Sequence, residues 1–126
     1  GIEVIIIMPH IPDKWYAFAV AQTYYEELIS AGVQIYEYTP GFVHAKVFVS
    51  DNDTATVGTI NLDYRSLYHH FECGTFIYNN PVVWEIERDF QNTLKACQKI
   101  TMLDVKARRI GMKMVGRVLR LIAPLM

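Results

Sequence analysis

Hydrophobic and polar positions in the first third of the chain follow two periodicities, one typical of buried strands and one typical of helices. The continuous apolar run Ile2–Met8 predicts a strand that is covered on both faces. Apolar residues then recur three and four positions apart over Lys14–Ala31, which predicts a helix with Asp13 as its N-cap. The run Val33–Tyr38 predicts the next strand. Strand, helix and strand in this order form a βαβ unit, so we expect the two strands to be parallel.

The middle of the chain predicts three more strands and a second helix. The strands are expected at His44–Ser50, Ala55–Gly58 and Phe71–Tyr78. Asn80 as cap and Pro81 at the first helical position begin the helix. The apolar stripe of this helix comprises Val83, Ile86, Phe90, Leu94 and Cys97. The whole pattern predicts an α/β fold, a mixed and largely buried sheet flanked by helices.

The C-terminal stretch from about Leu103 to Ile122 predicts an amphipathic helix with two separate stripes. The apolar stripe comprises Ala107, Ile110, Met114, Val118, Leu121 and Ile122. The basic stripe comprises Lys106, Arg109, Lys113, Arg117 and Arg120. One interpretation is an interfacial helix whose cations bind an anionic membrane; the other is a docked terminal helix with a solvated basic face. We therefore divide the chain into a domain over residues 1–101 and an appended helix over residues 102–126.

Composition narrows the class of protein. The chain has 126 residues, is 52% hydrophobic and carries a net charge of -1, which indicates one folded domain. Six of the 12 Lys and Arg residues lie in Val105–Met126, where there is no acid, so the rest of the chain is acidic. An acidic body disfavours nucleic acid as a partner, while the basic tail indicates an anionic one.

Cysteine and histidine usage predicts no metal site and no cofactor. Cys73 and Cys97 are interpreted as two reduced, buried thiols, and two cysteines without neighbouring His cannot form a tetrahedral zinc site. The adjacent His69 and His70 would point to opposite faces of a strand. No apolar run reaches the roughly 20 residues that cross a bilayer. Because the chain begins inside its first predicted strand, we expect it to be a piece of a longer protein.

Candidate chemistry concentrates between His44 and Asn61. On the predicted strand, His44 and Lys46 lie two residues apart and project from the same face, with Asp51 at the strand end. After the next strand, Gly58 permits a close turn and Asn61 offers an amide N–H. An imidazole, a cation and an amide donor that converge on one point are suited to phosphoryl transfer without a metal.

These residues resemble the motifs of the phospholipase D superfamily. His44, Lys46 and Asp51 fit its H-x-K-x4-D motif, and Gly58–Asn61 is similar to its G-S-x-N motif, with Thr in place of Ser. The run Asn61–Ser66 resembles the N-x-D-x-R-S run of bacterial cardiolipin synthases. The likeness extends over nearly the whole chain.

The resemblance implies a role for each site residue. One His would attack phosphorus and a second, protonated His would donate to the leaving alcohol, which makes His44 one of a pair. Lys46 and Asn61 would hold the phosphate oxygens, and Ser66 would hydrogen-bond in the pocket. Glu72 lies where the family carries a Glu that orients an active-site His, so we expect it to meet His44.

The same resemblance implies supporting roles for neighbouring polar residues. Asp51 is expected to act structurally, through a bond to the backbone or to Lys46. Asp63 and Arg65 are expected to pair and to shape their loop. The loop residue His10 is expected to be solvated, with a position facing the site as the alternative.

The implied activity is joining of two phosphatidylglycerol molecules into cardiolipin and glycerol at a bacterial membrane. The family site needs two H-x-K motifs and this chain carries one. We therefore expect a second motif, from the same parent chain or from a homodimer. Two alternatives stay open: hydrolysis of phosphodiesters, and a non-catalytic module that binds anionic membranes through its tail.

Overall fold

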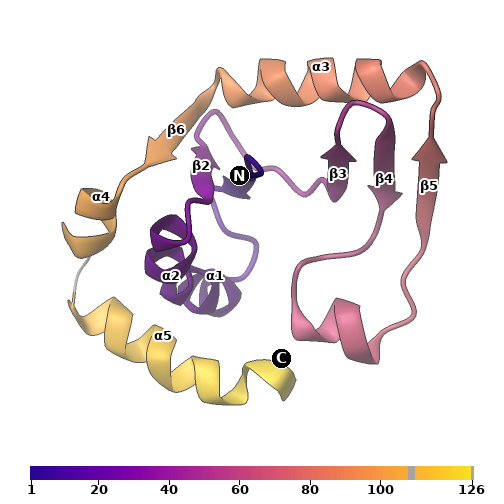
Figure 1. Cartoon of the computed structure of the whole chain (residues 1–126). Helices are drawn as coiled ribbons and strands as arrows, with labels where there is room; N and C mark the ends of the chain where they lie inside the picture. Colours follow the sequence, from indigo (N-terminus) through magenta and orange to yellow (C-terminus); the bar gives the residue numbers. More distant parts are fainter. Residues whose placement is uncertain (108–109, 126) are drawn as a thin grey trace. The chain divides into compact units, whose positions relative to one another are not determined.

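The protein has an α/β fold, as the hydrophobic pattern predicts, with its strands in two three-stranded sheets (Figure 1). The computed structural model describes residues 1–107 and 110–125, and the side chains of 110–113 and 125 are not part of that description. The chain divides into two compact units, Gly1–Val43 with Ala96–Met126 (unit 1) and His44–Lys95 (unit 2). The helices after residue 101 therefore belong to the same unit as the N-terminal residues.

Unit 1 contains the predicted parallel strand pair and one strand that the sequence did not reveal. Strand β1 pairs with β2 in parallel, in the register Ile7 to Tyr36, which confirms the βαβ unit. Strand β6 pairs with β2 on its other side and runs antiparallel. The sheet and its connecting helices are β1 (Ile5–Pro9), α1 (Trp15–Thr23), α2 (Tyr25–Ser30), β2 (Gln34–Tyr38) and β6 (Cys97–Ile100).

The core of unit 1 joins one helix face to the central strand. Tyr25 of α2 and Ile35 of β2 are 2% and 1% exposed, and Ile100 and Val105 pack with them. Partly buried apolar residues complete the cluster: Met8, Leu28, Ile29 and Val33. Burial of these side chains holds the sheet and α2 together.

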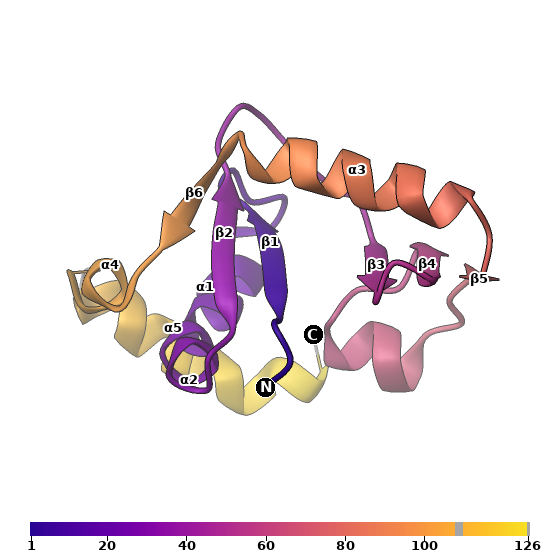
Figure 2. The ribbon, with the colours of Figure 1, turned by 45° about the horizontal axis from the view of Figure 1, so that its top comes forward.

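Within the described residues, the predicted C-terminal helix comprises α4 (Met102–Ala107) and α5 (Ile110–Ile122), and α5 is followed by the 3₁₀ turn η2 (Ala123–Leu125). Thr101 begins α4, because its backbone N–H and its hydroxyl both donate to the Asp104 carboxylate at 2.7 and 2.6 Å. Helix α5 packs against α1, and Figure 2 shows it running alongside α1 and α2. Within the described residues, no helix has the length and apolar character that a membrane span requires.

Unit 2 is an antiparallel meander with a helical turn and one helix. The strand order is β3-β4-β5, and both pairings are antiparallel. The β3–β4 connection is a tight turn over residues 51–53, closed by the Asp53 N–H, which donates to the Ser50 carbonyl at 3.3 Å. Asp51 and Asn52 have positive φ values of 51° and 58°, which Asp and Asn tolerate. The elements are β3 (Val47–Ser50), β4 (Thr54–Gly58), the π-helical turn η1 (Arg65–His69), β5 (Gly74–Tyr78) and α3 (Val82–Leu94).

Some helix boundaries differ from the prediction. The first helix is interrupted at Tyr24, which separates α1 from α2. Lys14, not Asp13, occupies its N-cap position, and the Lys14 carbonyl accepts from the Phe18 N–H at 3.1 Å. Helix α3 begins one residue later than predicted, with Pro81 and not Asn80 at its N-cap position, but the Asn80 side chain still accepts from the Val82 N–H at 3.0 Å.

Both cysteines lie outside the elements predicted for them. Cys97 begins β6 and does not continue α3, because that helix ends at Leu94 and the chain must extend to pair with β2. Cys73 precedes β5 and is exposed, so its predicted burial is wrong. Cys73 and Cys97 are not joined by a disulfide, and partial burial raises the pKa of the Cys97 thiol.

Candidate functional site

One end of the unit 2 sheet brings together three segments that are far apart in sequence. The Gly58 N–H donates to the Lys46 carbonyl at 3.2 Å, which continues the β3–β4 ladder past the start of β3. The Thr59 N–H donates to the Cys73 carbonyl at 2.9 Å, which continues the β4–β5 ladder in the same direction. His44, Lys46 and Glu72 therefore lie at one end of the sheet with the residues that follow Gly58.

Gly58 permits this convergence. A Cβ at Gly58 would lie 2.2 Å from the Cys73 carbonyl oxygen and 2.5 Å from the Gly74 Cα. Both neighbours are backbone atoms, which cannot rotate away as a side chain does. The expected role of Gly58 in a close turn is thus realised as a close approach of β4 to β5.

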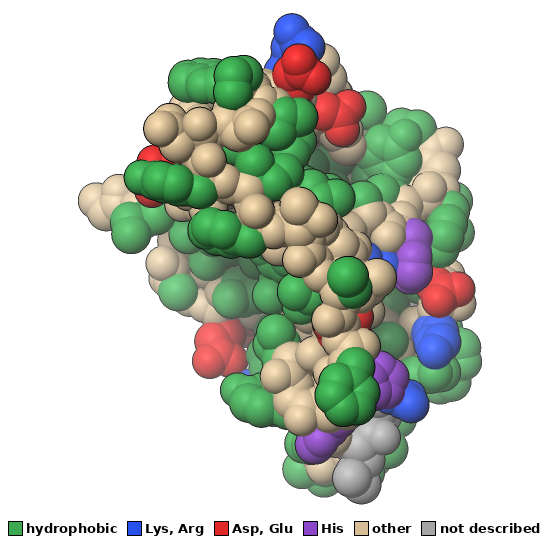
Figure 3. Space-filling model, turned by 90° about the vertical axis from the view of Figure 1, so that its right-hand side faces the viewer, with side chains coloured by type: hydrophobic (Ala, Val, Ile, Leu, Met, Phe, Trp, Pro, Cys, Tyr) green, Lys and Arg blue, Asp and Glu red, His purple; other side chains and the backbone are tan. Residues whose placement is uncertain are grey.

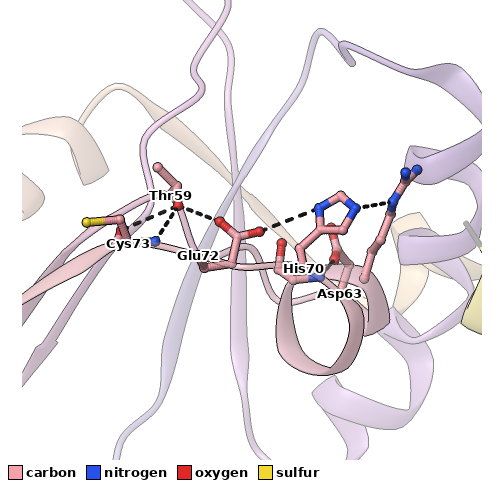
Figure 4. Close-up of polar contacts among 7 residues, drawn as sticks. Thr59, Asp63, His70, Glu72 and Cys73 are labelled. Carbon is pink, nitrogen blue, oxygen red and sulfur yellow. Dashed lines mark hydrogen bonds and ion pairs between the residues drawn. The ribbon is translucent and has the colours of Figure 1, made fainter.

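Glu72 is the centre of a polar cluster at this end (Figure 4). The Thr59 hydroxyl donates to one oxygen of the Glu72 carboxylate. This hydrogen bond, and a second from the Ser66 hydroxyl, lower the pKa of Glu72, and the nearby His70 and Lys46 lower it further. Glu72 is therefore an anion that two hydroxyls hold in place.

The imidazole of His70 lies between Glu72 and Arg65. Its Nδ1 is 3.9 Å from Glu72 Oε1, and its Nε2 is 2.7 Å from Arg65 Nε. Because the guanidinium can only donate, Nε2 must accept, and the proton of the neutral ring lies on Nδ1, toward Glu72. Glu72 thus faces His70, while the family-based expectation that it orients an active-site His by meeting His44 stays a prediction.

The π-helical turn η1 places Ser66, Arg65 and His70. The Asp63 carboxylate accepts from the Ser66 N–H at 2.7 Å and so caps the turn. The His70 N–H closes it by donating to the Arg65 carbonyl at 2.8 Å. Asp63 and Arg65 thus have separate partners, and their predicted pairing is wrong. Single π-turns of this kind occur frequently at functional sites.

His44 and Lys46 precede β3 and do not lie within it. The Lys46 ammonium donates to the His44 carbonyl at 2.9 Å, and its charge also acts on Glu72. His44 is exposed, whereas Lys46 and Asn61 are half-buried. The cation, the carboxylate and the loop that carries Asn61 therefore share one end of the sheet.

Asp51 is the one member of the H-x-K-x4-D motif that lies elsewhere. It occupies the hairpin turn at the opposite end of β3, roughly 15 Å along the strand from Lys46. Its carboxylate accepts from the Ser50 hydroxyl at 3.2 Å. A structural role fits this position, but the alternative of a bond to Lys46 does not.

Sequence reasoning missed Thr59 and Arg65 as partners within the Glu72 cluster. The hydroxyl of Thr59 also accepts from the Cys73 N–H at 3.0 Å, so it fixes the start of β5 as well as the carboxylate. The signal was a hydroxyl directly after the strand-ending Gly58. For Arg65 there was no comparable signal, because its contact depends on the π-turn.

His10 takes part in a separate polar cluster in unit 1. Its Nδ1 is 2.9 Å from the carboxylate of Glu37, which is 3% exposed. The Tyr25 hydroxyl donates to the same carboxylate at 3.3 Å. The half-exposed imidazole thus provides a hydrogen-bond partner for a buried carboxylate. The expectation of a solvated loop His did not include this structural role.

The predicted membrane-binding cations belong to unit 1. Arg117 on α5 and Lys106 on α4 are exposed. Arg120 lies with its guanidinium carbon 3.9 Å from the centre of the Tyr24 ring and Nη2 3.5 Å from Glu27. Lys113 is part of α5, and Arg109 lies outside the described residues.

Unit 2 also carries many exposed hydrophobic side chains around the site. Phe71, directly before Glu72, is fully exposed, and Leu62 and Tyr68 are 66% and 74% exposed. Figure 3 shows a face on which histidine, basic and acidic side chains lie close together among hydrophobic ones. Among the residues that the structure describes, no cluster of three or more His, Cys, Asp or Glu is placed to hold a metal ion.

Comparison with known proteins identifies the family. The sequence model described as "Cardiolipin synthase, PLD-like domain" matches residues 1–94. Over all 126 residues the chain is 53% identical to an uncharacterised protein of Streptococcus mutans, of which it covers 27%. It is 40% identical to a cardiolipin synthase of Clostridium perfringens and 38% identical to cardiolipin synthase 2 of Bacillus anthracis, and it covers 26% and 24% of these proteins.

The chain thus spans about a quarter of the length of the relatives that it matches. No solved structure matches it significantly. The family match covers residues that contribute to both units, including the whole Glu72 cluster. Together with the relatives at 38–40% identity, it shows that this chain belongs to the family of phospholipase D-like domains of cardiolipin synthases.

Proposed function

We propose that this chain contributes one of two catalytic motifs to an enzyme that joins two phosphatidylglycerol molecules into cardiolipin and glycerol at a bacterial membrane. One observation carries the proposal: the β3–β4–β5 ladder assembles Lys46 and Glu72 at the same end of a sheet as His44 and the loop of Asn61. The second motif would come from elsewhere in the same parent chain or from a second copy of this one.

In the first step, a nitrogen of one imidazole attacks the phosphorus of phosphatidylglycerol. A P–N bond forms and the P–O bond to the glycerol headgroup breaks, so the phosphatidyl group is carried as a phosphohistidine. The second imidazole, which is protonated, gives its proton to the departing glycerol oxygen. His44 is one member of this pair.

In the second step, a headgroup hydroxyl of another phosphatidylglycerol attacks the phosphohistidine. Its proton returns to the second imidazole, the new P–O bond forms and the P–N bond breaks. The products are cardiolipin and a regenerated His pair. No metal or cofactor takes part in either step.

The surrounding groups stabilise charge in both steps. The Lys46 ammonium and the Asn61 amide would bind the non-bridging phosphate oxygens, where negative charge grows in the transition state. The Glu72 carboxylate, fixed by Thr59 and held near Lys46, would keep the cation and the imidazoles oriented. The Ser66 hydroxyl supports Glu72 through a hydrogen bond, and it would also hydrogen-bond in the substrate pocket.

Hydrolysis is the second candidate function, favoured by the exposure of His44. Water in place of the second headgroup would resolve the same phosphohistidine and release phosphatidic acid. The acceptor, and not the first step, distinguishes the two functions.

The test uses vesicles of phosphatidylglycerol with EDTA present and reads products by mass spectrometry. The purified chain is assayed beside a fusion of two copies, which supplies two motifs in one polypeptide. We expect the fusion to form cardiolipin and glycerol in equal amounts and the His44→Ala fusion to form neither. His69→Ala, which removes an exposed imidazole outside the Glu72 cluster, is the matched control and is expected to remain active.

Three results would contradict the synthase. Phosphatidic acid as the only lipid product would identify a hydrolase. Turnover by the His44→Ala fusion would rule out a mechanism that depends on a phosphohistidine at His44. Loss of activity in EDTA would replace the mechanism with one that requires a metal.

A further inference from the structure

Helix α5 presents its apolar stripe to solvent. Met114, Val118 and Leu121 are 62%, 65% and 82% exposed. At about 100° per residue, these three positions lie about 140–160° around the helix from Gly116, so they form the side opposite to it. A docked amphipathic helix normally buries its apolar stripe, and α5 does the reverse.

The side of α5 that carries Gly116 packs against α1. Gly116 is buried, and a Cβ there would lie 2.6 Å from the Ala19 carbonyl oxygen and 2.8 Å from Thr23 Cγ2 of α1. Arg120, next to Gly116 on the wheel, stacks on the Tyr24 ring. These contacts fix the rotation of α5, which runs alongside α1 within unit 1 (Figures 1 and 2). They leave the apolar stripe exposed.

Charge identifies the occupant of this surface. The stretch Val105–Met126 contains six Lys and Arg residues and no acid. Arg117 is exposed and lies about 100° around the helix from Gly116, at the edge of the apolar stripe. An exposed apolar stripe with the Arg117 cation at its edge matches the acyl chains and the anionic headgroups of a phospholipid surface.

We infer that the outer side of α5, formed by Met114, Val118 and Leu121 with Arg117 at its edge, docks into the interface of an anionic bilayer while Gly116 stays packed on α1. This surface differs from a free amphipathic tail because unit 1 holds it ready before it meets lipid. Arg120, expected from its spacing to bind the membrane, serves the packing side instead.

The test is co-sedimentation of the purified chain with phosphatidylglycerol vesicles and with phosphatidylcholine vesicles, at low and high salt. We expect binding to phosphatidylglycerol that is at least about tenfold tighter than binding to phosphatidylcholine and that weakens with salt. Leu121→Asp should weaken binding to phosphatidylglycerol by about tenfold or more. Leu103→Asp is the matched control, since Leu103 on α4 is 79% exposed and the charge change is identical; its binding should stay within about twofold of wild type.

Equal loss in the two variants would overturn the assignment of the surface to α5, and equal binding to both lipids would overturn its anionic specificity. Sedimentation velocity tests the alternative occupant. If the chain does not bind vesicles, and Leu121→Asp converts a dimer into a monomer, the stripe binds a second copy of the chain instead. Circular dichroism checks that each variant is folded. The assay needs no catalysis, so its outcome is independent of the phosphatidyl transfer proposed above.

Discussion

The two ends of the β3–β4–β5 sheet both carry residues of the H-x-K-x4-D motif, yet they are built differently. At one end, Lys46 and Glu72 lie near each other, and hydroxyls hold the carboxylate. At the other end, Asp51 occupies a tight turn with a positive φ and bonds to its neighbour Ser50. Spacing along a strand therefore does not place all members of a motif at one point: residues five apart on an extended chain lie at opposite ends of it.

Removal of the cation at the first end should give the largest effect. Lys46→Met is expected to lower the rate of phosphatidyl transfer by roughly 10²–10³-fold, because the charge that develops on phosphate loses its counter-charge. Product formation from phosphatidylglycerol vesicles measures it. Lys95→Met, an exposed lysine of unit 2 just after α3, is the matched control, and an equal loss there would mean that general charge matters and the position does not.

A second prediction concerns the close approach that forms this end. Gly58→Ala is expected to destabilise unit 2 by roughly 1–3 kcal/mol, because its new Cβ would meet backbone atoms of Cys73 and Gly74. Urea unfolding followed by Trp84 fluorescence, in a Trp15→Phe background, reports this unit alone.

Gly74→Ala is the contrast to this variant. Its Cβ would meet the Ile60 side chain at 3.2 Å, which can move, so we expect a loss of less than about 1 kcal/mol. A Gly58→Ala variant as stable as wild type would show that β4 and β5 can separate without cost at the site.

The third prediction is the pH dependence of the same end. The pKa of Glu72 is lowered in the folded state, so the unfolded chain binds the proton more tightly. The stabilisation is complete above the unfolded pKa and is lost as the pH falls below about 4. The free energy of unfolding of the wild type should therefore fall between about pH 5 and pH 3, and we expect a smaller fall in Glu72→Gln. Glu85→Gln, an exposed acid on α3, is the charge-matched control; an equal reduction there would rule out a specific role for Glu72.

The smallest effect is expected at the other end. Asp51→Asn should leave transfer activity within about threefold and stability within about 0.5 kcal/mol of wild type, because Asn tolerates the left-handed backbone of this turn. Asp51→Val should be less stable by about 1–2 kcal/mol. An Asp51→Asn enzyme that is stable but inactive would show that the turn end also contributes to catalysis, which contradicts the difference between the two ends.

Local patterns predicted much of this fold. The parallel pairing of β1 with β2, the consecutive strands β3 and β4, and the Asn80 hydrogen bond at the start of α3 followed from periodicity and from residues near one another in sequence. Strand β6 was missed, because Cys97 continues the apolar spacing of α3 and only pairing with β2 makes the chain extend there. The break at Tyr24 likewise had no Gly or Pro to mark it.

The site was predictable as far as its motifs reach. Glu72 was found by resemblance and Gly58 by its backbone requirement. The Arg65–His70 contact depends on a π-turn, whose hydrogen-bond pattern leaves no mark in residue spacing. The orientation of α5 was missed for another reason: the periodicity defines its apolar stripe, but Gly116, a residue without a side chain, decides which side packs.

The most direct test of the central claim, that one end of this sheet is the phosphate site, is an NMR titration of the chain. The ligand is glycerophosphoglycerol, the water-soluble headgroup of phosphatidylglycerol, which needs neither a bilayer nor a second motif. Shift changes are expected only in the segments around His44, Lys46, Thr59, Asn61 and Glu72, with the Asp51–Asn52 turn unchanged. Shifts at the turn, or none at the Glu72 end at saturating ligand, would contradict it.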